Sequence, residues 1–164
     1  MTTAYIGIGS NVGDRAAFCR RAVDALDGAE GIRVAAVSSL YETEPLGGPP
    51  QRSFVNVVAQ VESELEPHPL LEACKGIETR LGREPSDIRW GPRVVDIDVL
   101  LYGEEKVVEA DLEIPHPRMA QRRFVLVPLL EIAPDVTDPW GGRYSDRLDE
   151  AEGKVELIEP YEAP

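Results

Sequence analysis

The 164 residues predict a single α+β domain, in which a mostly antiparallel sheet carries helices packed on it. Three observations predict this class: β-rich and helix-like segments alternate along the chain, no internal repeat is present, and 43% of the residues are hydrophobic. A chain of this length buries roughly two-thirds of its unfolded surface, which is enough for a core without disulfides or a structural metal. We therefore expect one domain over residues 1–164.

The first half of the chain predicts a strand, a helix and two further strands. Apolar side chains recur every three or four positions in the helical segment, and Gly28 follows it as a helix-ending residue. A loop rich in Gly and Pro, residues 44–51, separates the last two strands. The four predicted elements are residues 4–9, 15–27, 33–41 and 54–62.

The second half predicts a helix, a strand and a short helix. The first helix follows Pro67 and ends at Gly82, because apolar residues between them recur at spacings of three and four. Residues 94–102 form the most apolar strand, and Pro128 suits the first turn of a helix that ends at Ile132. The order β-α-β-β-α-β with a helical tail is the ferredoxin-like split βαβ arrangement.

Charge and hydropathy exclude several classes of partner. The 17 basic and 30 acidic residues give a net charge of −13, and such a charge opposes binding to nucleic acid or to anionic lipid. The N-terminus has no basic segment before a long apolar run, and no stretch approaches the ~20 apolar residues of a membrane span. We expect a cytoplasmic protein, in which residues 136–164 are an acidic tail that packs on or trails the domain without chemistry of its own.

Asp96 and Asp98 are the acidic residues of the apolar segment 94–102. Strand side chains alternate between two faces, so both carboxylates point to one face while the apolar residues between them point to the other. Two such carboxylates repel each other and are costly to desolvate, and a hard divalent cation such as Mg²⁺ would compensate them. The alternatives are two exposed strand carboxylates or partners for nearby arginines.

Two groups of arginines flank this acidic pair, in a chain that is otherwise acidic. Guanidinium groups bind phosphate oxygens through two hydrogen bonds, so arginines around a metal site indicate a polyphosphate ligand and phosphoryl-type transfer. A salt bridge to one of the surplus acids explains any single arginine equally well. The two groups are Arg80, Arg83, Arg89 and Arg93, and, after His116, Arg118, Arg122 and Arg123.

Three further residues are candidates with bland alternatives. Glu78 falls at the edge of the apolar arc of its helix, where it needs either a ligand or a buried arginine as its partner. Phe54 and Asn56 share one strand face and could stack on and hydrogen-bond a flat heterocycle. An ordinary half-exposed strand face explains the last two as well.

Seven segments together resemble the 6-hydroxymethyl-7,8-dihydropterin pyrophosphokinase family. The most specific is Arg-Trp-Gly-Pro-Arg-Val-Val-Asp-Ile-Asp at residues 89–98, whereas the first strand and its Gly-Ser-Asn turn are less specific. The resemblance extends from about residue 4 to residue 135. The other six segments are residues 4–11, 41–47, 54–56, 77–78, 114–118 and 123–129.

The resemblance implies an activity and its participants. It implies transfer of pyrophosphate from ATP to the hydroxymethyl oxygen of the reduced pterin, with release of AMP, in folate biosynthesis. It also implies a ferredoxin-like fold, two Mg²⁺ ions, and loops that close over both substrates. The expected partners are these two small molecules, and we expect the chain to act as a monomer.

The resemblance also implies roles for particular residues. Asp96 and Asp98 match the metal ligands, and Arg83 and Arg93 match loop arginines that meet the phosphates; all four are catalytic candidates. Two departures are Lys75, where some members have glutamine, and Pro117, where others have tyrosine. The ATP contacts implied are Lys75, Glu78, Trp90, Val99, His116 and Arg122.

For the pterin, the resemblance implies two aromatic walls and one amide. Phe54 and Phe124 match the walls, and Asn56 matches the amide that recognises the edge of the ring. Backbone groups of a neighbouring loop assist the amide. The loop residues are Thr43, Glu44 and Leu46.

Two other functions fit the pattern of residues. A ferredoxin-like module that senses a nucleotide without chemistry would bind it without Mg²⁺. A metal-dependent phosphohydrolase would cleave ATP without any pterin. Identification of the nucleotide product, with and without the pterin, separates all three.

Overall fold

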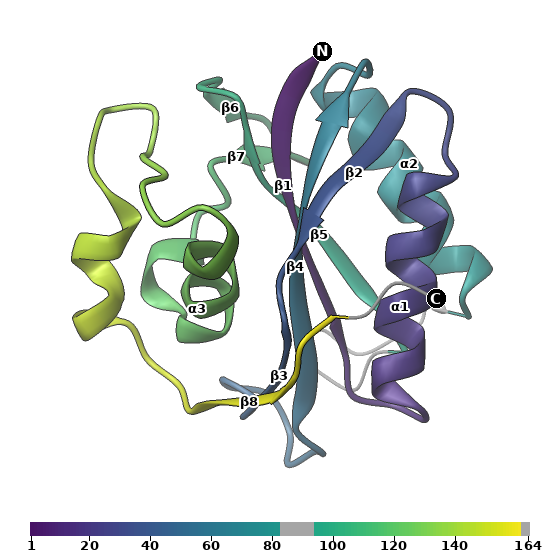
Figure 1. Ribbon diagram of the computed structural model, residues 1–164, viewed down its shortest axis with the longest axis vertical. Coiled ribbons are helices and arrows are strands. Elements are labelled where there is room, and N and C mark those ends of the chain that lie inside the picture. Colours follow the sequence, from purple (N-terminus) through teal and green to yellow (C-terminus); the bar gives the residue numbers. More distant parts are fainter. Residues whose placement is uncertain (83–93, 162–164) are drawn as a thin grey trace.

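The computed structural model describes residues 1–82 and 94–161 as three layers, with a central sheet between two sets of helices (Figure 1). Helices α1 (Arg15–Asp27) and α2 (Pro67–Arg80) cover one face of the sheet, and α3 (Arg123–Ile132) covers the other. Among the described residues, no helix has the length and apolar character needed to cross a membrane. The layer that contains α3 also contains two 3-10 helices, η1 (Met119–Gln121) and η2 (Tyr144–Glu150).

All strand pairs of the main sheet are antiparallel, which confirms the predicted fold class. Its strands run in the order β5-β1-β4-β3-β8, and β2 also pairs with β4. A separate ribbon joins β6 (Val107–Val108) and β7 (Glu113–Ile114). The main-sheet strands are β1 (Thr2–Ser10), β2 (Ile32–Val37), β3 (Leu40–Thr43), β4 (Phe54–Ser63), β5 (Asp96–Tyr102) and β8 (Val155–Glu159).

The strand predicted at residues 33–41 is two strands, β2 and β3, which lie along the same side of β4. The interruption lies at Ser38, where the backbone amide of Val58 donates to Ser38 Oγ at 2.9 Å rather than to a backbone carbonyl. Because a serine hydroxyl can replace a backbone acceptor, the ladder is interrupted without leaving a buried amide unpaired.

Helix α1 has the predicted bounds, because both of its ends are satisfied locally. The side chain of Asp14 accepts from the Ala17 amide at 3.1 Å, and the Gly28 amide donates to the Asp24 carbonyl at 3.0 Å. Helix α2 includes Pro67, which it was expected to follow, and it ends at Arg80, two residues before the predicted end at Gly82.

The start predicted for α3 is wrong. The helix begins at Arg123, and Pro128 lies in its interior instead of its first turn. An interior proline removes one helical hydrogen bond. However, Leu126 and Leu129 are both fully buried against the sheet, and their packing holds the helix together across the proline.

The acidic tail contributes an edge strand, which the residue pattern did not predict. Strand β8 pairs with β3 and crosses from the α3 layer to end beside α1 (Figure 1). Leu157 and Ile158 are 61% and 45% exposed, so the strand shows none of the alternation by which a half-buried strand is recognised.

Trp140, which precedes η2, is exposed, and the Lys106 ammonium lies 4.8 Å from the centroid of its ring.

The alternation of β1 and β5 divides the core into two parts and positions the site. Ile6 and Ile8 of β1 and Ile97 of β5 are buried in the core beneath α1 and α2. The residues between them face the α3 side, where Leu100 and Val58 belong to a second core. The candidate site lies on this second face, where the sheet is not fully covered.

Candidate active site

Asp96 and Asp98 lie on the same face of β5, as their spacing predicts, and two glycines stand opposite them. The antiparallel register pairs Asp96 with Gly9 and Asp98 with Gly7 of β1. Because glycine has no side chain, the Asn56 amide can lie over Gly9 and Leu100 can lie over Gly7, and both glycines line the cavity. The two carboxylates are partly buried and line a cavity of about 510 Å³.

The cavity brings together most of the predicted pterin and phosphate contacts that the structure describes. It opens between the sheet, the loop that follows β3, and the start of α3. The predicted site residues that line it are Thr43, Glu44, Leu46, Phe54, Asn56, Asp96, Asp98, His116, Arg122 and Phe124.

A second cavity, of about 260 Å³, adjoins the first. Its lining includes Val99, together with Leu71 from α2 and Leu112 from the loop between β6 and β7. Asp98 and His116 line both cavities. The acidic strand therefore stands at the junction of a larger cavity with aromatic walls and a smaller cavity with mainly aliphatic and acidic walls.

The orientation of the Asn56 amide is determined by its neighbours. The Thr43 hydroxyl donates to Asn56 Oδ1 at 2.5 Å, and Asn56 Nδ2 donates to the Ile8 carbonyl at 3.5 Å. A Cβ at Gly9 would lie only 2.6 Å from Asn56 Nδ2, so glycine is required there for the amide to occupy its place. From the sequence, only the backbone groups of Thr43 were expected in the site, and the hydroxyl of Thr43 is an additional contact.

Glu78 supports the acidic strand from the opposite side of the sheet. Its carboxylate is 8% exposed, and Oε2 accepts from the backbone amide of Ile97 at 2.7 Å. Ile97 lies between Asp96 and Asp98, so this bond ties α2 to the backbone of the acidic strand. Glu78 lines neither cavity, and Lys75 is exposed on α2.

His116 is neutral over the ordinary pH range. Burial, assisted by the charge of Arg122, lowers its pKa to about 4, although the carboxylate of Asp96 acts in the opposite direction. The Arg118 amide donates to His116 Nδ1 at 3.3 Å. The neutral ring therefore carries its proton on Nε2, which is a hydrogen-bond donor.

The guanidinium of Arg122 interacts electrostatically with both Asp98 and Asp96. Burial and the neighbouring Arg118 lower its pKa, whereas Asp98 and Asp96 raise it. The guanidinium also lies 5.4 Å from the centroid of the Phe124 ring. This contact couples a phosphate-binding candidate to one predicted aromatic wall.

Residues 5–134 match the profile of the 7,8-dihydro-6-hydroxymethylpterin-pyrophosphokinase (HPPK) family. The chain belongs to this family. The 2-amino-4-hydroxy-6-hydroxymethyldihydropteridine pyrophosphokinase of Methylorubrum extorquens is 51% identical over 136 residues, which are 83% of this chain and 85% of the relative. The enzyme of the same name from Bacillus subtilis is 45% identical over 133 residues, which cover 81% of this chain and 79% of that one. The resemblance inferred from the sequence motifs is thereby confirmed.

Solved structures share the fold of this HPPK-family chain. A Plasmodium falciparum HPPK-DHPS crystallised with pteroate aligns with a TM-score of 0.72 at 13% identity, over 91% of this chain and 40% of that chain. A structure titled as HPPK-DHPS in complex with substrates aligns with a TM-score of 0.69 at 14% identity, over 90% of this chain and 43% of that one. The present chain thus spans less than half the length of those chains.

Three site residues predicted for this HPPK-family chain, Arg83, Trp90 and Arg93, lie outside the described residues.

The structure also shows a residue near the site that the sequence patterns did not indicate as a site residue. Asn11 is 3% exposed, and its Nδ2 donates to Gln51 Oε1 at 2.8 Å and to the Arg52 carbonyl at 2.9 Å. It thereby joins the turn after β1 to the loop that carries Gln51 into the larger cavity. A Gly-Ser-Asn turn after a strand was visible in the sequence, but its partner 40 residues away was not.

Proposed function

We propose that this chain transfers the pyrophosphoryl group of ATP to the hydroxymethyl oxygen of 6-hydroxymethyl-7,8-dihydropterin, with Mg²⁺ held by Asp96 and Asp98. The single observation that carries the proposal is the position of Asp98 at the junction of two cavities, with Asp96 beside it in the larger one. A two-substrate transfer needs such a junction, because the acceptor oxygen and the reacting phosphorus must meet beside the groups that neutralise charge. Membership of the HPPK family supports the same reaction.

The donor set at the junction fits a hard divalent cation. Carboxylate oxygens are the protein ligands that Mg²⁺ prefers, and the cavity that Asp96 and Asp98 line offers room for water and phosphate oxygens. We propose that these carboxylates hold two Mg²⁺ ions. Bound there, the ions would supply charge neutralisation and alignment of the phosphate chain.

The larger cavity suits the pterin. Phe54 and Phe124 line it from β4 and α3, and a flat heterocycle between them gains stacking on both faces. Asn56, held by Thr43 and the Ile8 carbonyl, presents a fixed amide to the ring edge. A site built to hydrogen-bond a particular ring rejects rings that lack the matching groups, because its own polar atoms are then left unpaired.

The smaller cavity suits the nucleotide. Val99 contributes apolar surface, and neutral His116 offers its Nε2 proton to an acceptor near Asp98. Arg122 on the other side of the junction balances phosphate charge. We propose the same phosphate-binding role for Arg83 and Arg93 and nucleotide contacts for Lys75, Glu78 and Trp90, all from the family resemblance.

In the proposed reaction, the pterin hydroxymethyl oxygen attacks the β-phosphorus of ATP. The bond from that phosphorus to the oxygen that bridges to the α-phosphorus breaks, and AMP leaves with that oxygen. The hydroxyl proton passes to solvent or to a nearby carboxylate. Arg122 and the two loop arginines stabilise the charge that develops on the leaving group.

The test of this function is product analysis with ATP, Mg²⁺ and 6-hydroxymethyl-7,8-dihydropterin. We expect AMP and the pterin diphosphate in equal amounts, and no AMP when either the pterin or the metal is omitted. Formation of ADP, or cleavage of ATP without the pterin, contradicts the proposal and favours a phosphohydrolase. Binding of nucleotide without Mg²⁺ and without turnover favours a sensing module.

The acidic pair provides the first mutational prediction. Asp96→Ala lowers kcat by at least about 100-fold, because the loss of one carboxylate removes a metal ligand and charge stabilisation that single contacts of this kind supply. The melting temperature does not fall, because a repulsive pair has been relieved. Asp135→Asn, on a carboxylate that is 84% exposed, is the control and keeps full turnover. Full activity of Asp96→Ala would refute the metal site.

A further inference from the structure

Three residues between η2 and β8, Glu152–Lys154, form a strap that joins two separate parts of the chain. At one end, the Glu152 amide donates to the Gln121 carbonyl, and the Arg123 amide donates to the Glu152 carbonyl, both at 2.9 Å. Glu152 thus brackets Arg122 in a parallel bridge at the start of α3. This end of the strap is attached to the backbone from which Arg122 and Phe124 project.

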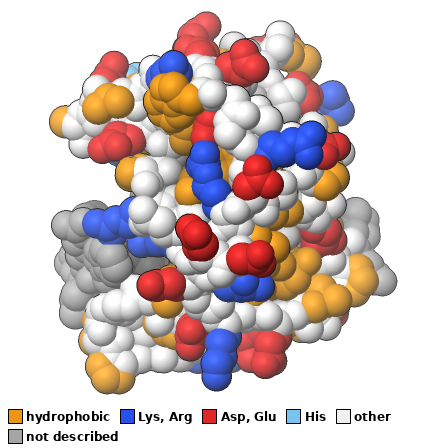
Figure 2. Space-filling model, turned by 90° about the vertical axis from the view of Figure 1, so that its left-hand side faces the viewer, with side chains coloured by type: hydrophobic (Ala, Val, Ile, Leu, Met, Phe, Trp, Pro, Cys, Tyr) orange, Lys and Arg blue, Asp and Glu red, His pale blue; other side chains and the backbone are white. Residues whose placement is uncertain are grey.

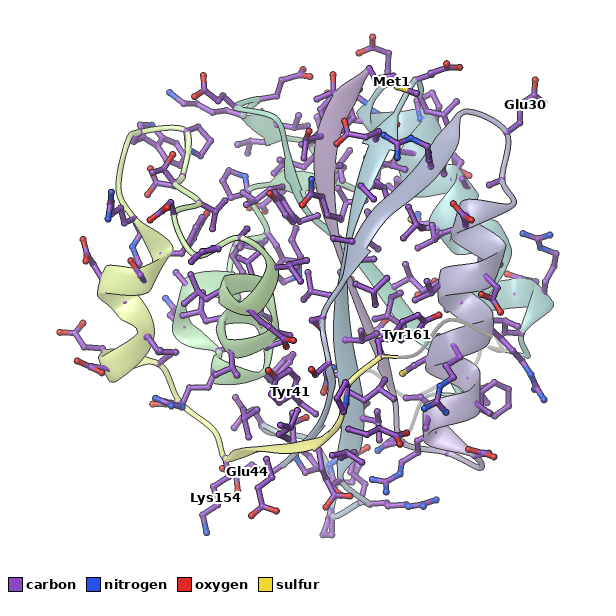
Figure 3. The ribbon with its side chains drawn as sticks, in the orientation of Figure 1. Met1, Glu30, Tyr41, Glu44, Lys154 and Tyr161 are labelled. Atoms are coloured by element: carbon purple, nitrogen blue, oxygen red, sulfur yellow. The ribbon has the colours of Figure 1, made fainter. Side chains whose placement is uncertain are left out.

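The other end of the strap is attached to the loop that follows β3. The Glu44 amide donates to the Lys154 carbonyl at 3.3 Å, and the Lys154 amide donates to Glu44 Oε1 at 3.0 Å. Figure 3 shows Glu44 and Lys154 side by side where the chain enters β8. The next residue, Val155, pairs with Thr43 in the sheet.

Gly153, in the middle of the strap, faces Leu46 of the loop after β3. Its φ is +108°, in the region that favours glycine, and a Cβ there would lie 3.7 Å from the Leu46 side chain. The strap therefore lies beside Leu46 as well as being hydrogen-bonded to Glu44.

The two ends of the strap are attached to segments that form opposite walls of the larger cavity. Leu46 and Thr43 line it on the sheet side, and Arg122 and Phe124 line it on the α3 side. The neighbouring elements are also fixed: Arg123 Nη1 donates to the Leu148 carbonyl in η2 at 3.1 Å, and Glu159 at the end of β8 pairs with Arg20 of α1. The strap is thus held on both sides and cannot lengthen without the loss of a bond.

We infer that Glu152–Lys154 sets the separation of the two walls and is therefore a positioning element for the pterin ring, through Leu46 and Phe124. The inference rests on the proposed placement of the pterin in this cavity. The contacts of the ring with Leu46 and Phe124 are sensitive to their separation, because a gap that grows by 0.5–1 Å forfeits roughly a quarter to a half of each dispersion contact. The loop after β3 does not line the nucleotide cavity, so a break at this end of the strap leaves the walls of the nucleotide cavity in place.

The test breaks the strap at one end and restores it with a conservative variant. Glu44→Ala removes the acceptor of the Lys154 amide, whereas Glu44→Gln keeps a side-chain oxygen that can accept the same bond. Glu156→Ala removes an exposed carboxylate in β8, two residues after Lys154, and serves as the charge-matched control. For each variant, KM for 6-hydroxymethyl-7,8-dihydropterin, KM for ATP, kcat and the melting temperature are measured.

We expect Glu44→Ala to raise the pterin KM by about fivefold, as the loss of one hydrogen bond would, with the ATP KM and kcat within about twofold of the parent. Glu44→Gln and Glu156→Ala keep the parental pterin KM. Equal pterin KM values for Glu44→Ala and Glu156→Ala overturn the inference, even if the melting temperature falls. Equal losses for both substrates overturn it too, because they indicate a general structural defect.

A second variant tests the other end of the strap. Glu152→Pro removes the amide that donates to Gln121, and Ala151 already has the extended conformation, φ −74° and ψ 147°, that a following proline requires. We expect the pterin KM to rise here too, together with the ATP KM because Arg122 lies at this end. The rise in pterin KM is less than the sum of both losses when the variant is combined with Glu44→Ala, because both act through one strap. Full additivity overturns the inference.

Failure of the strap and failure of the proposed function give different results. Asn56→Ala raises the pterin KM if the cavity binds the pterin, whatever the strap does. If Asn56→Ala acts and Glu44→Ala does not, only the strap is refuted. If neither variant changes the pterin KM, the placement of the pterin is wrong and the inference falls with it.

Discussion

Gly9 shows how one missing side chain can decide what a site recognises. It pairs with Asp96 across the β1–β5 ladder, and it lies beneath the Asn56 amide, where a Cβ would approach Nδ2 to 2.6 Å. Real contacts of this kind do not occur at such a distance, so any larger residue must displace the amide. The glycine therefore pairs with the proposed metal ligand Asp96 and makes room for the pterin-recognition candidate Asn56.

This arrangement predicts the effect of Gly9→Ala. The added methyl group displaces Asn56 from Thr43 and Ile8, so we expect the pterin KM to rise by about tenfold, the loss of one or two hydrogen bonds. Steady-state kinetics with varied pterin at saturating ATP measure the change.

Gly76→Ala is the matched control for that variant. Gly76 lies within α2, and nothing lies within 4 Å of an added Cβ. We expect unchanged kinetics and a gain of about 0.5–1 kcal/mol in unfolding free energy, because alanine is the better helix former. An unaltered pterin KM in Gly9→Ala, or an altered one in Gly76→Ala, contradicts the role given to Gly9.

Helix α3 is held to the sheet by one carboxylate with three donors. Glu131 accepts from the Ser39 amide at 2.9 Å, from the Ser39 hydroxyl at 2.8 Å and from the Tyr41 hydroxyl at 2.6 Å. Burial alone would raise the pKa of this carboxyl, but the hydrogen bonds from Tyr41 and Ser39 outweigh it and hold the pKa below its ordinary value. Tyr41 lies between α3 and β3 in Figure 3. This contact fixes the helix that carries Phe124 against the strand that carries Thr43.

The lowered pKa of Glu131 predicts a pH dependence of stability. As the pH falls below the ordinary carboxyl range, the unfolded chain takes up this proton before the folded chain does. The stabilisation is therefore present above that range and is lost as the pH falls toward the lower, folded-state pKa. Glu131→Gln should reduce the slope of unfolding free energy against pH in this acidic window, as measured by urea denaturation at a series of pH values. An unchanged slope contradicts the assignment.

At the scale of the whole molecule, most charged side chains lie on the surface, whereas the two cysteines lie in the core. Acidic and basic side chains are interspersed on the face that carries α3, although the chain has a net charge of −13 (Figure 2). Beneath α1 and α2, the core contains both cysteines of the chain, Cys19 and Cys74, each fully buried. Burial raises the pKa of each thiol to about 12, so neither forms a reactive thiolate in the folded protein.

These thiols report on the opening of the whole core. A thiol reagent at pH 8 should label neither cysteine within minutes in the native protein and both at once after denaturation. The labelling rate should increase with denaturant in parallel with global unfolding, because both residues lie in the same core cluster. Rapid labelling of one thiol without denaturant would show that α1 or α2 opens separately.

Local features of the chain allowed much of the fold and the core of the site to be predicted. The helix at residues 15–27, the strand that carries Asp96 and Asp98, and the placement of both carboxylates on one face all follow from periodicity and capping, which act over a few residues. The family could also be inferred from its motifs, because the residues that bind ligands are constrained in type and spacing.

Other features were decided only by the tertiary structure. These features depend on partners elsewhere in the chain: the start of α3, the strand at 155–159, and the bond from Thr43 to Asn56. The strap Glu152–Lys154, which is bonded to Gln121 and Glu44, depends on such partners too. An interior proline is tolerated because buried leucines hold its helix, and an exposed edge strand exists because β3 offers it hydrogen bonds. Such energies arise only when the chain has folded, so no local pattern of residues encodes them.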